Sequence, residues 1–373
     1  GHLWRPRRNF GILLSMLGLK NYVLVRRELP CGCWTGFDMS ERLSIRNPRN
    51  GEYDYEIVAT TAREIASITS RMRVAQKLWR EKGLEYRVSV LEKLKTAVAG
   101  RREELVNALS TDTGRLYISV AEVDGIASAI DRWTAVARAQ TAPETKNSKA
   151  MPFIEFRSEK EPYPVAGAIS PWNFPMTLSM IDALPAMLSG GTAIIKPSEV
   201  TPRFAGPMRR AVAEVEELKD ILHIVDGDAS TGAALIDHVD IVCFTGSVAT
   251  GRMVAESAAR NFIPSILELG GKDPAIVLED ADVERAATSL LRASIVNTGH
   301  ACQSIERIYV HQSHFDDFVE KIVAKAQNVK FNYPDIHSGH IGPIIFEKQA
   351  DIIKTQLAAA VSKGATVHTG GEI

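Results

Sequence analysis

One cysteine, Cys302, stands in surroundings that suit a nucleophile. It lies in residues 297–310, NTGHACQSIERIYV, where small residues separate a helical pattern from a strand-like one. A cysteine attacks only as its thiolate, and a free thiol with a pKa of roughly 8.5 is mostly protonated at neutral pH, so it needs a polar and partly open setting. A loop of small residues provides that setting. Most free cysteines are nevertheless small buried hydrophobes, so both roles stay open for Cys302 at this point.

A carboxylate, Glu268, lies in the apolar stretch 266–273, ILELGGKD, just before a Gly-Gly turn. A carboxylate near the end of an apolar strand is costly, and burial would raise its pKa toward that of a useful general base. A salt-bridged or solvated residue at the end of a strand explains Glu268 equally well.

An amide side chain, Asn173, stands between two prolines in residues 171–175, PWNFP. The prolines restrict the backbone of this turn and leave the Asn173 amide as a donor with a fixed direction. An oxyanion forming on a carbonyl carbon needs such a donor, which can supply about 3 kcal/mol of transition-state stabilisation. The simpler interpretation is an asparagine chosen for the geometry of the turn.

Two further turns carry residues that suit a nucleotide. Residues 196–199, KPSE, follow an apolar run, and they could also simply begin a helix. Residues 244–251, FTGSVATG, place glycines between a strand and a helix, where phosphates can approach the amides of a helix N-terminus. The spacing is not G-x-G-x-x-G, so this turn is weak evidence by itself. Cys243, directly before it, is expected to pack within the strand.

The elements that must position these residues form a regular alternation. The expected strands are residues 165–170, 192–196, 221–225, 241–244 and 263–267, and the expected helices are residues 176–188, 203–215, 230–237 and 250–261. Short apolar strands that alternate with helices predict an α/β fold, with a parallel sheet covered on both faces. Such sheets bind ligands at the carboxyl ends of their strands, and the turns described above lie there.

The residues before this alternation are predicted to be helical. Apolar side chains recur at three- and four-residue spacing from Thr61 onward, with stops at Gly83 and Gly114, and a further long helix is expected over residues 120–139. These apolar stripes are expected to be core. Residues 146–161 alternate polar and apolar side chains, which predicts a protruding strand or hairpin.

Taken together, ELGGK around Glu268, N-x-G-x-x-C ending at Cys302 and PWNFP around Asn173 resemble the non-acylating, NAD(P)-dependent aldehyde dehydrogenase superfamily. The resemblance implies that an aldehyde is oxidised to a carboxylic acid through a cysteine thiohemiacetal and a thioester. Cys302 would be the nucleophile, Glu268 the base for hydrolysis, and Asn173 an oxyanion donor together with a backbone N–H.

The resemblance also implies an NAD site. Lys196 and Glu199 would bind the hydroxyls of the adenosine ribose, and a carboxylate there disfavours a 2′-phosphate, so NAD is preferred while NADP stays possible. Residues 246–251 would bind the pyrophosphate. The complete set of implied cofactor residues is Ile169, Pro171, Trp172, Lys196, Ser198, Glu199, Gly246, Ser247, Gly251, Leu269 and Gly270.

The implied architecture has a Rossmann-like NAD-binding domain over residues 39–145 and 164–269. A bridging β-hairpin over residues 146–163 would serve a homodimer or homotetramer, and an α/β catalytic domain would begin at residue 270. The family continues well beyond TGGEI at residue 373, so we expect a carboxy-terminally truncated, incomplete catalytic domain. His300 stands where the family usually has Gln.

Composition excludes several other classes. Among 373 residues, 44 Lys and Arg balance 45 Asp and Glu, so no global charge indicates nucleic acid or an anionic membrane as a partner. The four cysteines form no secreted disulfide framework, and we expect no metal. Residues 1–38 are a basic leader or an extension before Met39, and we expect a cytoplasmic protein.

Two alternatives remain open. A coenzyme-A-acylating dehydrogenase would use the same cysteine, although such enzymes generally lack the base that Glu268 would supply. The chain could also be a non-catalytic NAD-binding fragment. The sequence predicts neither which aldehyde is the substrate nor whether the chain is active.

Overall fold

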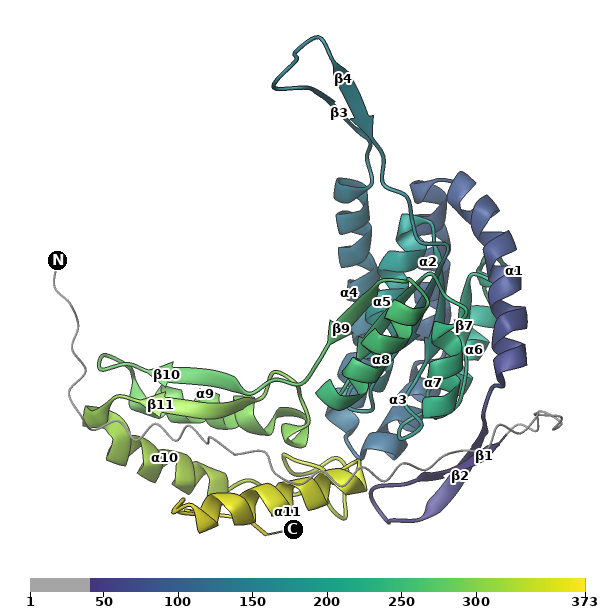
Figure 1. The fold of residues 1–373 in the computed structure, drawn as a ribbon. Coiled ribbons are helices and arrows are strands. Elements are labelled where there is room, and N and C mark those ends of the chain that lie inside the picture. The colour runs from purple at the N-terminus through teal and green to yellow at the C-terminus, as the bar shows by residue number, and fades with distance from the viewer. Residues whose placement is uncertain (1–40, 373) are drawn as a thin grey trace, which may run out of the picture. The chain divides into compact units, whose positions relative to one another are not determined.

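A five-stranded parallel sheet is the central feature of the computed structural model, which describes residues 41–372 (Figure 1). The predicted leader, residues 1–38, lies outside the described residues. The strands are β5 (Val165–Ile169), β6 (Thr192–Lys196), β7 (Leu222–Ile224), β8 (Ile241–Thr245) and β9 (Ser265–Glu268), in the order β7-β6-β5-β8-β9. The order reverses between β5 and β8, and ligands of open α/β sheets bind at such a reversal, at the carboxyl ends of the strands. The predicted α/β fold is confirmed.

Helices cover both faces of this sheet. After each of the first four strands comes one helix: α5 (Pro175–Ser189), α6 (Ala205–Ala213), α7 (Ala229–Ile236) and α8 (Val248–Arg260). Alternate residues of β6 show the two layers, since Ile195 packs into the core under α5 and α6 while Ile194 packs into the core under α7 and α8. All five residues of β6 are buried, as expected of a central parallel strand.

Four helices precede the sheet: α1 (Ala62–Glu81), α2 (Leu84–Gly100), α3 (Arg102–Thr113) and α4 (Leu116–Gln140). Their starts and stops follow the sequence. Thr61 and Glu64 form a reciprocal capping box at the start of α1, and Gly114 ends α3 with a left-handed backbone (φ 66°). The predicted helical layer is confirmed, with α2, α3 and α4 in the same core as α5.

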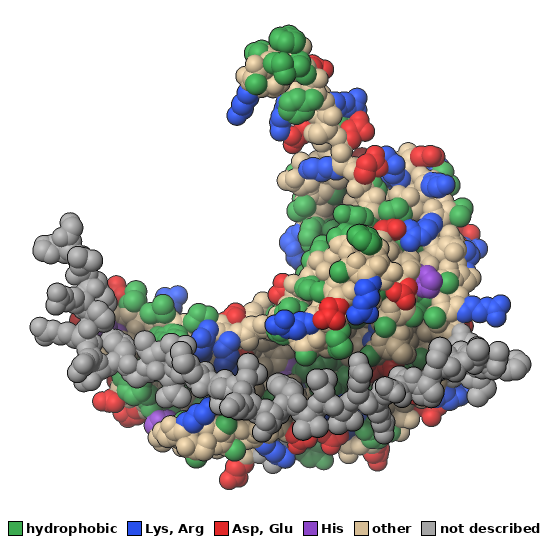
Figure 2. Space-filling view, in the orientation of Figure 1, with side chains coloured by type: hydrophobic (Ala, Val, Ile, Leu, Met, Phe, Trp, Pro, Cys, Tyr) green, Lys and Arg blue, Asp and Glu red, His purple; other side chains and the backbone are tan. Residues whose placement is uncertain are grey.

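Two antiparallel hairpins lie outside the sheet. β1 (Arg42–Arg46) pairs with β2 (Tyr53–Val58), which the sequence did not predict. β3 (Glu144–Asn147) pairs with β4 (Glu155–Ser158), where a protruding hairpin was expected. Hydrophobic side chains gather at the tip of the second hairpin, and Met151, Phe153 and Ile154 are exposed there (Figure 2). The assignment of domains to residues 39–145, 146–163, 164–269 and 270–373 stays a prediction.

A second, smaller sheet follows β9. β10 (Asp273–Val277) pairs in parallel with β11 (Ile305–Val310), and α9 (Val283–Ile295) and the 3-10 turn η2 (Val296–Gly299) connect them. Next come η3 (Gln312–His314), α10 (Phe315–Gln327) and α11 (Glu347–Ser362). The fully buried part of this core is small and consists of Val277, Val283, Ala287 and Phe318. Across residues 41–372, no helix is both long enough and apolar enough to span a bilayer.

Candidate active site

Cys302 lies in the loop between α9 and β11, as the sequence predicted, and its side chain is partly exposed. The backbone just before it is unusual, because Asn297, Thr298 and Gly299 all have positive φ (54°, 59° and 74°). Asparagine and glycine tolerate this region, whereas a β-branched threonine there is strained by on the order of 1–3 kcal/mol. Thr298 is held by the Gly342 N–H, which donates to its Oγ1 at 2.9 Å. We call residues 297–302 the nucleophile loop.

The nucleophile loop is bonded to the turn that carries Asn173. Asn173 Nδ2 donates to the His300 carbonyl at 2.7 Å, and Asn297 Nδ2 donates in return to the Asn173 carbonyl at 2.8 Å. The Trp172 ring packs edge-on against the His300 ring, with centroids 5.1 Å apart. An asparagine amide has two N–H donors. One N–H of Asn173 is bonded to the carbonyl of His300, which stands two residues before Cys302.

Two charged residues that the sequence left unassigned support this arrangement from α4. Arg115, the buried N-cap residue, donates from Nη1 to the Asn297 carbonyl at 2.8 Å, and its Nη2 lies 3.0 Å from His300 Nδ1. Glu122, also buried, accepts the backbone N–H groups of Met176 and Thr177 at 3.1 and 2.9 Å. These are amides of the first turn of α5, directly after PWNFP, where a carboxylate complements the helix dipole.

Burial dominates the titration of these groups. It lowers the pKa of Arg115 to about 9, which leaves the guanidinium charged at neutral pH, and raises the pKa of Glu122 to about 7. It also lowers the pKa of His300 to about 3, with the charge of Arg115 as a second cause. His300 is therefore a neutral imidazole, and its Nδ1 can accept a hydrogen bond.

Glu268 is the last residue of β9, and its side chain is exposed. Its carbonyl accepts the Gly246 N–H at 3.0 Å, so the end of β9 is joined to the glycine turn after β8. Gly271, three residues later, lies against Cys302: a Cβ at Gly271 would be 2.5 Å from the Cys302 carbonyl oxygen. The strand end with Glu268 and the nucleophile loop are therefore in direct backbone contact through Gly271.

A second carboxyl group shares the environment of Glu268. Asp182 of α5 is half-buried, and burial raises its pKa to about 6, with the charge of Glu268 as a second cause. Cys243 of β8 is buried, and burial followed by the charge of Asp182 raises the pKa of its thiol to about 12. This inert thiol agrees with the packing role expected for Cys243.

The turn after β6 carries three of the predicted cofactor residues. Lys196 is 4% exposed and its ammonium lies 3.1 Å from Glu199 Oε2, while Glu199 remains partly exposed. Ser198 Oγ accepts the Val200 N–H within the same turn. Thr201 Oγ1 donates to the Trp172 carbonyl at 3.1 Å, so this turn is bonded to PWNFP after β5, near Ile169 and Pro171.

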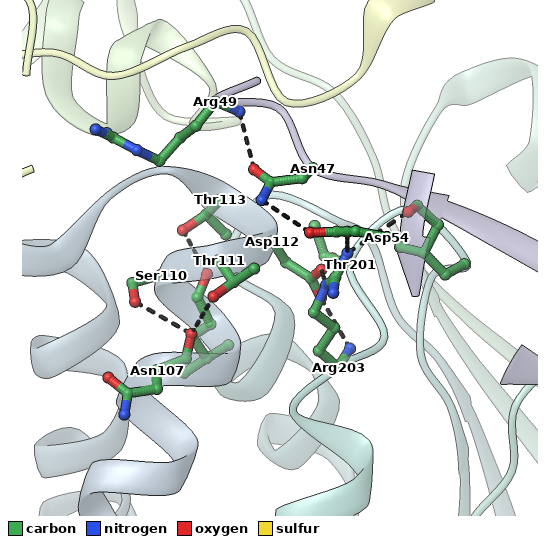
Figure 3. Close-up of polar contacts among 12 residues, drawn as sticks. Asn47, Arg49, Asp54, Asn107, Ser110, Thr111, Asp112, Thr113, Thr201 and Arg203 are labelled. Atoms are coloured by element: carbon green, nitrogen blue, oxygen red, sulfur yellow. Dashed lines mark hydrogen bonds and ion pairs between the residues drawn. The ribbon is translucent and has the colours of Figure 1, made fainter. Parts of the chain in front are cut away.

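A buried ion pair fixes the far end of that turn (Figure 3). Arg203 donates to Asp112, which is 1% exposed, through its backbone N–H at 2.8 Å and through Nε at 2.6 Å. It also pairs with Asp54 of β2, and its guanidinium lies over the Tyr55 ring. The turn is thereby anchored to α3 and to the β1–β2 hairpin.

The turn after β8 begins α8 with Ser247 as its cap, whose Oγ accepts the Thr250 N–H at 3.1 Å. Gly251 allows close packing, because a Cβ there would be 2.6 Å from Leu269 Cδ2. Gly246, Ser247, Gly251, Leu269 and Gly270 are thus brought together at the ends of β8 and β9. The donor chemistry fits a dinucleotide: an ammonium and a carboxylate at β6, and the N-terminus of α8 for an anion.

The structure thus brings the predicted residues to one edge of the sheet, in two groups that meet at PWNFP and Gly271. The roles assigned to individual residues stay predictions. Sequence reasoning missed Arg115, Glu122, Asp182 and Asn297. Arg115 could have been noticed in the sequence, because it is a basic residue directly after Gly114, the glycine that ends a helix. The contacts of Glu122 and Asp182 depend on how the helices pack and leave no such pattern in the sequence. Among the residues described, no group of three or more His, Cys, Asp or Glu side chains is arranged to hold a metal ion.

Comparison with known proteins gives the family. A family model described as the aldehyde dehydrogenase family matches residues 34–373. The chain belongs to the aldehyde dehydrogenase family. Similar solved structures include PutA from Anabaena variabilis, with 50% identity, a TM-score of 0.86 and coverage of 89% of this chain and 71% of that one.

Two other family members are similar at lower identity. Lactaldehyde dehydrogenase from Escherichia coli is 30% identical, with a TM-score of 0.85 and coverage of 91% of this chain and 71% of that one. The chloroplastic betaine aldehyde dehydrogenase of Beta vulgaris is 32% identical over 353 residues, which cover 91% of this chain and 70% of that protein. The matches span between 56% and 72% of the curated aldehyde dehydrogenases and related enzymes compared.

Proposed function

We propose that this aldehyde dehydrogenase oxidises an aldehyde to a carboxylic acid with NAD(P) through a thioester on Cys302. The observation that carries the proposal is the convergence of three distant segments. The nucleophile loop is bonded to Asn173 on one side and touches Gly271, just after Glu268, on the other. A nucleophile, an oxyanion donor and a carboxylate base are the groups that acyl-level oxidation needs.

The first half-reaction forms a bond between Cys302 Sγ and the carbonyl carbon. The carbonyl oxygen becomes an oxyanion, which the second N–H of Asn173 and a backbone N–H would stabilise. NAD(P), when bound, supplies the acceptor for the hydride that leaves the carbon with its electron pair. The product on the protein is a thioester of Cys302.

The second half-reaction is hydrolysis. Glu268 takes a proton from water, the hydroxide adds to the thioester carbon, and the C–S bond breaks to release the acid and the Cys302 thiolate. Its exposed side chain at the end of β9 can reach solvent for this purpose. A coenzyme-A-acylating enzyme would use a thiol in place of water, and Glu268 is the residue that favours water.

The cofactor would be held by the two turns at β6 and β8. Lys196 and Glu199 would bind the adenosine ribose, and the N-terminus of α8 at Gly246 and Ser247 would bind the pyrophosphate. The carboxylate of Glu199 favours NAD. Among similar proteins, a betaine aldehyde dehydrogenase from Staphylococcus aureus was solved with NAD+, whereas the D-glyceraldehyde dehydrogenase of Picrophilus torridus is named for NADP(+). NADP therefore stays a second possibility.

The β3–β4 hairpin would contribute to a homodimer or homotetramer, since Phe153 is 84% exposed at its tip and Phe156 is also exposed. A cytoplasmic location is part of the same proposal.

The test is NADH formation with a panel of aldehydes, with and without coenzyme A. We expect NADH and free acid without coenzyme A, unchanged in Cys243→Ala and abolished in Cys302→Ala. A requirement for coenzyme A would favour the acylating alternative. NAD binding without turnover of any aldehyde would favour the non-catalytic one.

A further inference from the structure

Arg115 is the best-buried cation next to the nucleophile loop, and the mechanism above gives it no task. It is 5% exposed, and it lies 182 and 185 positions before its two partners, Asn297 and His300. Its Nε has no partner among residues 41–372. Burying a guanidinium is costly unless it is paired, so a residue of this kind needs a reason to be there.

The two bonds of Arg115 hold both ends of the left-handed segment. Nη1 donates to the Asn297 carbonyl, where this segment begins, and Nη2 donates to the His300 ring just after it. The same Asn297 carbonyl also accepts the His300 N–H at 3.0 Å. A guanidinium presents its donors in a rigid fork, so one side chain can fix the spacing between the two partners.

The contact also selects one tautomer of His300. Arg115 carries only donors, so His300 Nδ1 must accept, and the ring proton must be on Nε2. The ring is further held against Trp172, next to Asn173 in the PWNFP turn. The His300 carbonyl is the group that Asn173 Nδ2 contacts, so the position of His300 bears directly on the direction of the Asn173 amide.

The same helix supports the other side of the site. Glu122, two turns after Arg115 on α4, accepts the first amides of α5 behind PWNFP. One helix therefore holds the nucleophile loop by the guanidinium of Arg115 and the Asn173 turn by the carboxyl group of Glu122. The separation between Cys302 and Asn173 is then set by α4 and less by the loop itself.

We propose that Arg115 is a positioning residue, which holds the nucleophile loop through Asn297 and His300 so that Cys302 and Asn173 face the same carbonyl group. Its place in catalysis rests on the proposed aldehyde oxidation, whereas its hold on the loop can be measured without turnover. Arg115 touches neither substrate nor cofactor in this assignment.

The experiment compares Arg115→Met with Arg87→Met. Arg87 is a matched control, because it is also 5% exposed and donates to backbone carbonyls, those of Leu188 and Arg80, in α5 and α1. The rate of Cys302 alkylation by iodoacetamide is measured by mass spectrometry in the whole chain, with NAD binding as the check that each variant is folded. We expect Arg115→Met to change the Cys302 alkylation rate about 10- to 100-fold, because the conformation of the loop sets both the thiolate fraction and the exposure of this thiol, and each unit of thiol pKa is about tenfold. Arg87→Met should leave the Cys302 alkylation rate within about twofold of that of the original chain. Residues that share no partners usually influence each other by no more than about 0.5 kcal/mol, which is about twofold in a rate.

A second readout is the tautomer of His300. Nitrogen NMR of the ring should show Nε2–H in the original chain and a mixture of tautomers in Arg115→Met. His300→Gln keeps a hydrogen-bond acceptor for Arg115 and should preserve the Cys302 alkylation rate. His300→Leu removes the acceptor, and its Cys302 alkylation rate should be close to that of Arg115→Met. If Arg115→Met also unfolds the chain, this His300 pair tests the same contact without touching Arg115.

The proposal is overturned if Cys302 is alkylated at the original rate in Arg115→Met, or if Arg87→Met changes the Cys302 alkylation rate by as much as Arg115→Met does. It is equally overturned if His300→Gln and His300→Leu behave alike. If the original chain oxidises no aldehyde while these alkylation differences are present, the proposed function fails and the positioning of the loop by Arg115 stands. If aldehyde turnover is found, Arg115→Met should lower kcat and leave the KM for NAD unchanged.

Discussion

The sheet β5–β9 and the sheet β10–β11 are held together very differently. Every residue of β6 is buried, and helices cover the sheet on both faces. In the smaller sheet, Ile276 is 71% exposed, and α11 contains no buried residue. Parallel strands are normally covered on both sides, and within residues 41–372 this cover is complete only for the larger sheet.

The candidate site uses both regions. The cofactor turns lie on the well-packed sheet, while Cys302 lies between α9 and β11 of the weakly packed one. Three polar contacts from other segments hold the nucleophile loop: those of Asn173, Arg115 and the Gly342 N–H. The difference teaches that cofactor binding and nucleophile placement have separate physical supports, and they should be separable by mutation.

The largest separation is expected from Cys302→Ala. Loss of the nucleophile should lower aldehyde turnover by at least about 10³-fold, as for other covalent catalysts, while NAD binding stays the same. Turnover is followed by NADH absorbance and NAD binding by calorimetry. Cys243→Ala is the matched control and should keep activity, and retained turnover in Cys302→Ala would contradict the assignment.

Hydrogen exchange should show the same contrast along the backbone. Amides of β5, β6 and β8 should exchange at least about 10³-fold more slowly than those of β10, β11 and α11, because local opening spans the range from near zero to global unfolding. Mass spectrometry of peptides after a time course measures this. Uniform protection through residue 372 would show that the two regions unfold as one unit.

A pair of core substitutions should sharpen the comparison. Leu184 of α5 is fully buried, and Leu184→Ala should lower the free energy of unfolding by about 2–5 kcal/mol. Ile352 of α11 is 45% exposed, and Ile352→Ala should cost less than about 0.5 kcal/mol. Urea midpoints measure both, and equal effects would contradict the difference in packing.

A further effect, smaller per pH unit than the cost of Leu184→Ala, is expected on the pH dependence of stability. Burial raises the pKa of Glu122 to about 7 in the folded protein, above its ordinary 4.5. The folded state therefore binds more protons between these values, so this contribution to stability is present below pH 4.5 and is lost as the pH rises toward 7. Glu122→Gln should flatten that slope, by at most about 1.4 kcal/mol per pH unit. Glu81→Gln, at an exposed position on α1, should leave the slope unchanged, and an unchanged slope in Glu122→Gln would refute the assignment.

The success of the predictions from the sequence also differs between the larger and the smaller sheet. The strands of the larger sheet and the helices between them were predicted to within a few residues, because apolar runs with clear stops encode them locally. The strand β10 was missed, since it is short, contains Pro274, which argues against a strand, and pairs with β11 beyond a whole helix. The roles of Cys302, Glu268 and Asn173 were suggested by motif and spacing, and the structure adds the contacts between the segments that carry them.

The supports of the site could not be predicted in the same way. Arg115 and Glu122 lie on α4, where the apolar stripes indicated only core, and their partners are more than 50 positions away. A sequence shows that a residue is charged but not that it is buried or which residue it contacts. Both depend on how the helices pack in the folded protein. The left-handed backbone at Asn297 and Thr298 is likewise set by the bonds around it.

The most direct test of the account is the chemical state of Cys302 in Glu268→Gln. With aldehyde and NAD, this variant should release about one equivalent of NADH and then turn over slowly, because the thioester forms but is not hydrolysed. Acid quenching and mass spectrometry should locate one acyl group on Cys302, equal in amount to the NADH. An acyl group on Cys243, or a burst of NADH with no acyl group on the protein, would contradict the account.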